Sequence, residues 1–144
     1  MGKNSYIYYI LKDKKLVIEI LKGDFDLTDF LNLKRKEALD PDFDPNYNSI
    51  LDIRNVRNAF SKEIRDDLKE YKGIIDTVVS ITGLKKTAVV TSKPAQVAGI
   101  MWYQMIDGRN IEYKAFSSLE AASMWLGVSD IDLEKIDPAL TDDQ

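Results

Sequence analysis

The chain has 144 residues, of which 44% are hydrophobic and 31% are charged, a composition typical of one soluble globular domain with a sizeable core. It contains no cysteine and no histidine, which excludes disulfides, thiolate metal sites and catalysis by Ser-His or Cys-His pairs. The net charge is −4, and no basic face with interleaved aromatic residues indicates nucleic-acid binding.

Acidic residues gather at the C-terminal end, where residues 128–144 are rich in aspartate and contain a single lysine, Lys135. We therefore divide the chain into one domain, residues 1–127, and an acidic tail, residues 128–144. No apolar run approaches the length of a membrane helix, and the N-terminal MGKNSYIYY lacks the features of a signal peptide. We expect a cytoplasmic protein without a membrane span.

The first two apolar segments predict a β-hairpin. Residues 5–12 and 15–22 are strand candidates separated by Asp13-Lys14. In the second strand one face is apolar, and the other, less apolar face is formed by Val17, Glu19 and Leu21.

The next segments alternate between helix and strand. Asp26 is expected to cap a helix that ends near Leu39, with the cationic run Lys34-Arg35-Lys36 favouring its dipole. A strand is predicted over 48–54, and a long amphipathic helix from Ser61 to Gly83.

The second half continues the alternation. Residues 86–92 predict a fourth strand, 94–107 a helix, 110–116 a fifth strand, and the segment from Ser117 or Ser118 to Gly127 a last helix. Strands that alternate with helices favour parallel crossovers. The predicted class is therefore α/β, with a mixed five-stranded sheet, an N-terminal β-hairpin and four main helices.

Two stretches are candidate sites. The helix PAQVAGIMWYQMID is apolar on nearly all sides, so it is either buried on two sides or meets a partner subunit, a hydrophobic ligand or a membrane surface. Its candidate contact residues are Met101, Trp102, Tyr103 and Met105. The second stretch is the turn expected after the third strand, with Asp52, Arg54, Asn55 and Arg57 as solvated charged or polar groups and Ser61 as a helix N-cap.

Known binding motifs are absent. No calcium loop, phosphate-binding loop or dinucleotide fingerprint is present, so we expect no metal site and no cofactor. No convergent pair of catalytic groups can be located from spacing, so we do not expect an enzyme.

Several segments resemble STAS domains. KLVIEILKGDFDLTDFLNL resembles the start of that fold, and ILDIRNV resembles its next strand. The segments KTAVVTSKPAQVAGIMWYQMID and FSSLEAASMWLG resemble the SpoIIAA-like branch. The resemblance implies a non-catalytic regulatory or protein-interaction module, dimeric or bound to a regulatory protein.

The resemblance is incomplete at the regulatory serine. Phosphoswitch members carry Asp-Ser-x-Gly after the third strand, and this motif is missing here, so Ser61 matches the phosphorylated serine by location alone. The alternative function is a carrier of a small apolar ligand or lipid. STAS domains loosely resemble lipid-transfer domains, and the helix with Met101 and Trp102 could form the wall of a pocket.

Overall fold

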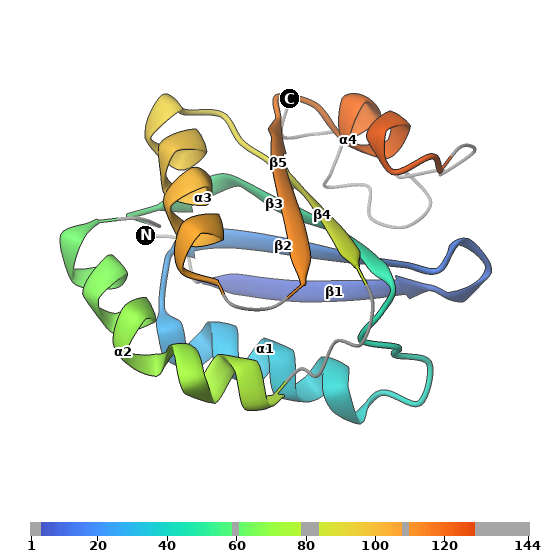
Figure 1. Ribbon diagram of the computed structural model, residues 1–144, viewed down its shortest axis with the longest axis horizontal. Helices are drawn as coiled ribbons and strands as arrows, with labels where there is room; N and C mark the ends of the chain where they lie inside the picture. The colour runs from blue at the N-terminus through green and yellow to red at the C-terminus, as the bar shows by residue number, and fades with distance from the viewer. Residues whose placement is uncertain (1–3, 59–60, 79–83, 108–109, 129–144) are drawn as a thin grey trace.

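The computed structural model describes residues 4–58, 61–78, 84–107 and 110–128, with the backbone alone for residues 71–78. Its strands form one mixed sheet in the order β1-β2-β3-β4-β5, in which β1 is antiparallel to β2 and the other neighbours are parallel (Figure 1). The strands are β1 (Ser5–Leu11), β2 (Leu16–Asp24), β3 (Asn48–Arg57), β4 (Lys85–Val90) and β5 (Ile111–Phe116).

Four helices and a short 3-10 turn complete the described residues. The helices are α1 (Leu27–Leu39), α2 (Lys62–Val78), α3 (Pro94–Ile106) and α4 (Leu119–Trp125), and the turn η1 (Lys12–Lys14) closes the hairpin. This confirms the predicted α/β class, the mixed five-stranded sheet, the N-terminal hairpin and the four helices. Of the described helices, none is long and apolar enough to cross a membrane.

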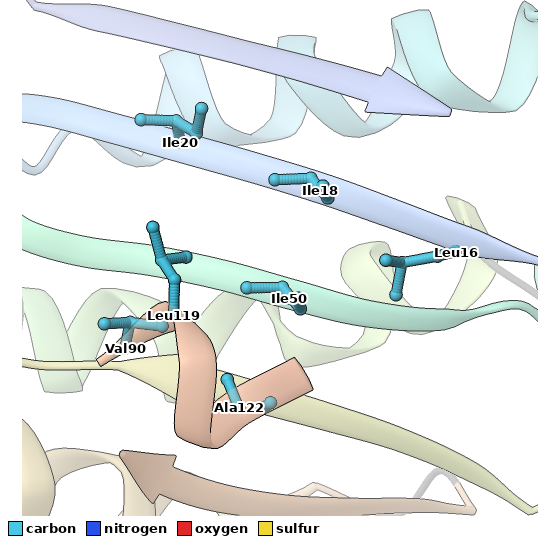
Figure 2. Close-up of a cluster of buried hydrophobic side chains, with 8 residues drawn as sticks. Leu16, Ile18, Ile20, Ile50, Val90, Leu119 and Ala122 are labelled. Atoms are coloured by element: carbon cyan, nitrogen blue, oxygen red, sulfur yellow. The ribbon is translucent and has the colours of Figure 1, made fainter. Parts of the chain in front are cut away.

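One face of the sheet carries a closed apolar core. Alternate residues of β2, β3 and β4 point to this face, and α4 packs on it through Leu119 and Ala122. Figure 2 shows how the side chains of the sheet and of α4 meet there. The α4 helix lies apart from the other three helices in Figure 1, and it is capped by Ser118, whose Oγ accepts from the Ala121 N–H at 3.1 Å.

The opposite face is covered by α1 and α3, which contribute Leu33 and Ile100 to a second buried cluster. The α2 helix packs against α1 rather than directly on this cluster, through contacts between Leu68 and Leu31. The predicted N-cap of α1 is confirmed, because Asp26 Oδ1 accepts from the Asp29 N–H at 3.0 Å.

The third strand is longer than predicted. It continues to Arg57 because β2 also continues, and a register shift between Ile20 and Lys22 lets the ends of the two strands pair. Gly23 has φ +100°, a conformation that residues with a side chain rarely adopt, and β2 therefore passes through glycine at this point. The prediction that the strand ends in a turn after residue 54 is therefore wrong. The expected helix end at Gly83 and the tail 129–144 lie outside the described residues.

The closed core gives a direct test of the packing. Leu16 is fully buried, whereas Leu39 at the end of α1 is 85% exposed. We expect Leu16→Ala to lower the free energy of unfolding by about 2–5 kcal/mol, because it removes buried methyl groups and leaves a cavity. The matched substitution Leu39→Ala should change it by less than about 0.5 kcal/mol. Denaturant unfolding of both variants measures the difference, and equal losses would contradict this placement of the core.

Candidate functional site

A cavity of about 90 Å³ lies between the sheet and the helices α1, α2 and α3. Most of its described wall is apolar and comes from β2, β3, β5, α1, α2 and α3. Its apolar lining includes Leu21, Phe30, Leu51, Ile53, Leu68 and Ile100. One part of the lining is polar, and it consists of Glu19, Lys34, Glu37, Ser49, Lys85 and Thr87. The cavity is therefore amphipathic.

Strand alternation places the polar residues together. Residues 17, 19 and 21 of β2 share a face, and the corresponding face of β3 carries Ser49 and that of β4 carries Lys85 and Thr87. The register sets Ser49 beside Val17 on one side and beside Thr87 on the other. Polar side chains therefore lie close together on β2, β3 and β4. They are buried on a face of the sheet where most other positions are apolar.

Helix periodicity brings two more charged groups to the same place. Lys34 and Glu37 are three residues apart on α1, so they share one side of the helix. Lys34 Nζ lies 2.5 Å from Glu19 Oε2, and both side chains are largely buried. The ammonium of Lys34 also lies 5.3 Å from the centre of the Phe30 ring. These contacts join α1 to β2 through a charged pair.

The two carboxyl groups of the cavity differ in protonation. Glu19 and Glu37 are each only 2% exposed and are hydrogen-bonded to each other. Burial opposes the ionisation of Glu19, but the charge of Lys34 and the hydrogen bonds from Glu37 and Lys34 keep its pKa below the usual range. Burial and the negative charge of Glu19 raise the pKa of Glu37 far above the usual range.

The geometry around Glu37 agrees with a neutral acid. No N–H or O–H group of the described residues donates to its Oε2 atom, although the atom is buried. A buried carboxylate is normally satisfied by several donors, so an ionised Glu37 would be costly here. The site therefore holds one carboxylate and one carboxylic acid near neutral pH.

The predicted contact residues of α3 separate into two groups. Met101 and Met105 are 66% and 84% exposed, so they project away from the sheet. Trp102 is half-buried against the Leu31 and Leu68 cluster. Tyr103 lines the cavity and meets the ring of Tyr113 edge-on, with 5.7 Å between ring centres. One side of α3 thus forms part of the cavity wall, and another side faces solvent.

The charged stretch of β3 is not a solvated turn, which corrects the prediction. Asp52 and Arg54 form a buried two-point ion pair, with Nε–Oδ1 at 3.1 Å and Nη2–Oδ2 at 2.8 Å. They are two residues apart in a strand, so both side chains point to the same face. Arg57 is exposed and pairs with Asp24 at 2.9 Å, and Asn55 is exposed. None of these residues lines the cavity.

Ser61 occupies the position expected of a helix N-cap. Its Oγ accepts from the Ile64 N–H at 3.3 Å, at the start of α2. This hydrogen bond satisfies one of the backbone donors that have no partner within the helix.

The polar end of the cavity was not predicted as a site. Lys34 was interpreted as part of a cationic helix end, but it turns inward whereas Arg35 and Lys36 are exposed. Two signals were present in the sequence. Glu19 interrupts an apolar strand, and Phe30, Lys34 and Glu37 follow the helical spacing of a buried stripe.

Comparison with known proteins finds no match, neither to a family model, nor to a curated protein, nor to a solved structure. The resemblance to STAS domains therefore stays a prediction. Over the residues that the structure describes, no group of three or more acidic, histidine or cysteine side chains is arranged to hold a metal ion.

The neutral state of Glu37 predicts a pH dependence of stability. The pKa of Glu37 is higher in the folded than in the unfolded chain. Its stabilising contribution to the free energy of unfolding is therefore complete below about pH 4 and is lost as pH rises through the folded pKa. Between about pH 5 and pH 8, the free energy of unfolding should fall relative to that of Glu37→Gln by up to about 1.4 kcal/mol per pH unit. Denaturant unfolding of both proteins at several pH values measures this difference. Parallel pH profiles would show that Glu37 is ionised in the folded protein.

Proposed function

We propose that this protein is a non-catalytic binding protein that holds a small amphipathic molecule in the cavity between the sheet and α1–α3. The observation that carries this proposal is the combination of an apolar wall with a buried group of charged side chains at one end. Ligand sites in proteins have this character, with mostly apolar linings and a few convergent polar groups that orient the ligand.

The cost of the cavity supports the proposal. A cavity of about 90 Å³ lowers stability by about 2 kcal/mol relative to a core filled by side chains, and buried charges add a desolvation cost of their own. The opposite face of the same sheet carries a closely packed apolar cluster, so this sequence is able to form a closed core. A ligand that fills the cavity and contacts its polar end would offset both costs.

The cavity volume limits the size of the ligand. An apolar cavity of about 150 Å³ accommodates benzene, so the enclosed part of a ligand here is smaller than a benzene ring. A short or partly enclosed molecule fits this limit better than a complete lipid. The proposal therefore changes the carrier hypothesis from a small apolar ligand or lipid to a small amphipathic compound.

Native mass spectrometry of freshly purified protein tests this function. We expect a bound small molecule that is lost on denaturation. Leu51→Phe should abolish this adduct because Leu51 lines the cavity and the larger ring would fill it. Leu39→Phe is the matched control, since Leu39 is 85% exposed and outside the cavity lining. An adduct that persists in Leu51→Phe, or an apo mass together with no binding of any amphipathic probe, would refute the proposal.

A second candidate is the regulatory or protein-interaction module implied by the STAS resemblance. The observation that favours it is the exposure of Met101 and Met105, four residues apart on one side of α3. Exposed methionines suit an adaptable apolar contact with a second copy of the chain or with a regulatory protein.

Charge substitution on α3 tests this second candidate. Met101→Glu with Met105→Glu should dissociate a dimer without unfolding the chain, because both side chains face solvent in the single chain. Met124→Glu is the matched control, on a 75% exposed methionine of α4. Sedimentation velocity reports the oligomeric state. Trp102 is unsuitable for this test because it packs against Leu31 and Leu68, so a charge there would destabilise the fold. A monomeric wild-type chain, or a dimer unaffected by the double substitution, would exclude self-association through this side of α3.

A further inference from the structure

One carboxyl oxygen at the polar end of the cavity has no hydrogen-bond partner. Glu37 lines the cavity and is only 2% exposed. Of the buried side-chain nitrogen and oxygen atoms that the structure describes, Glu37 Oε2 is the one that no other group reaches. A buried acceptor without a donor lowers stability, because it has lost its hydrogen bonds to water. Since Glu37 belongs to the cavity lining, a bound molecule can supply the donor.

A second buried polar side chain shows that the fold supplies such partners elsewhere. Gln96 of α3 is 4% exposed, and its Oε1 accepts from the Ser92 N–H at 2.8 Å. Its Nε2 donates to the carbonyl oxygens of Ile53 and Val56, at 2.9 and 3.3 Å. Protein groups therefore satisfy both ends of the Gln96 amide, whereas one end of the Glu37 carboxyl group is left to a ligand.

We propose, building on the proposed function, that the cavity takes a small molecule with a neutral hydroxyl group, in the simplest case a short-chain aliphatic alcohol, whose O–H donates to Glu37 Oε2. Its hydrocarbon part would contact the apolar lining, which includes Leu51, Ile53 and Ile100. The inference rests on the buried acceptor without a donor and on the place of Glu37 in the wall of an apolar cavity.

The hydrogen bond between the two glutamates agrees with this role of Oε2. Glu37 is bonded to Glu19, and since Oε2 has no partner, this bond falls to the other oxygen of Glu37. When a protonated Glu37 donates to Glu19 through that oxygen, Oε2 is a carbonyl oxygen, which only accepts. The oxygens of an ionised carboxylate also only accept. An O–H donor therefore suits Glu37 Oε2 in either protonation state.

Charged head groups match this acceptor less well than a hydroxyl group does. A carboxylate has no donor to offer to Glu37 Oε2. An ammonium has three N–H donors, and its charge would have to leave water for a mostly apolar cavity, which is costly. A hydroxyl group has one donor and no charge. The same lining contains the hydroxyl groups of Ser49 and Thr87, which are candidate partners for the ligand oxygen.

A pair of isomers tests the donor. The molecules n-butanol and methyl propyl ether have the same atomic composition, and only the alcohol has an O–H group. We expect n-butanol to bind about tenfold more tightly, because the ether leaves Glu37 Oε2 buried without a donor. NMR titration of the backbone amides measures both affinities and should place the shift changes at the cavity lining. A third ligand, n-butylamine, is protonated at neutral pH and should bind more weakly than the alcohol.

Two substitutions of Glu37 provide a matched pair of variants. Glu37→Gln keeps a carbonyl oxygen as the acceptor, and its amide N–H can donate to Glu19 as the acid O–H does, so the preference for the alcohol over the ether should remain. Glu37→Met has a side chain of similar size without an acceptor. Its preference for the alcohol should therefore fall about tenfold, to nearly equal affinities for the two isomers.

The ratio of the two affinities is a readout that a purely structural role for Glu37 would not change, since an altered cavity shape affects both isomers. If Glu37→Met folds, as measured by denaturant unfolding, and keeps the full preference for the alcohol, the ligand hydroxyl does not lie at Glu37 and the proposal is wrong. If this variant does not fold, the isomer pair on the wild-type protein decides alone.

The outcomes separate this inference from the proposed function. Equal binding of the two isomers to the wild-type protein, as expected if a water molecule already donates to Glu37 Oε2, would refute the hydroxyl group and leave the amphipathic binding site in place. Tighter binding of n-butylamine than of n-butanol would do the same. Failure of every head group to bind, together with an apo mass of the purified protein, would refute both.

Discussion

The ion pair between Glu19 and Lys34 is the interaction on which the described site depends. It joins the centre of the sheet to α1, with 2.5 Å between Nζ and Oε2 in largely buried surroundings. A charged pair at such depth persists only where each partner neutralises the other, because an isolated buried charge is costly. The pair also sets the state of Glu37, which lies on the same side of the helix, is hydrogen-bonded to Glu19 and is kept protonated by burial and by the charge of Glu19.

The two faces of the sheet have different roles. Under α4 an apolar cluster from β2, β3 and β4 packs against Leu119 and Ala122 (Figure 2). Under α1–α3 the same strands present Glu19, Ser49, Lys85 and Thr87 beside apolar neighbours. Because successive residues of a strand point to opposite faces, one sequence can encode an apolar cluster on one face and a partly polar cavity on the other. This division explains how the fold tolerates a cavity with buried charges.

Much of the architecture could be predicted, and the site could not. Hydrophobic periodicity and capping residues such as Asp26 and Ser118 gave the element order and most boundaries. The apolar composition of α3 drew attention to this helix, which borders the cavity through Ile100 and Tyr103 and not through the other predicted contact residues. The charged residues of β3 were misinterpreted because composition does not show that Asp52 and Arg54 pair with each other inside a strand. The resemblance to STAS domains still rests on the quoted segments alone.

By itself the sequence determined the α/β class, the alternation of strands and helices, and the absence of histidine and cysteine chemistry. These properties depend on local pattern and on composition, and both can be read from a single sequence. Only the tertiary structure decided which polar residues meet, because Glu19, Lys34, Glu37 and Lys85 come from β2, α1 and β4. Their encounter depends on strand register and on the rotation of α1 about its axis. The ion pair with Lys34 then decides which of the two glutamates keeps its proton, because it favours the charged form of Glu19, and the charge of Glu19 together with burial keeps Glu37 protonated.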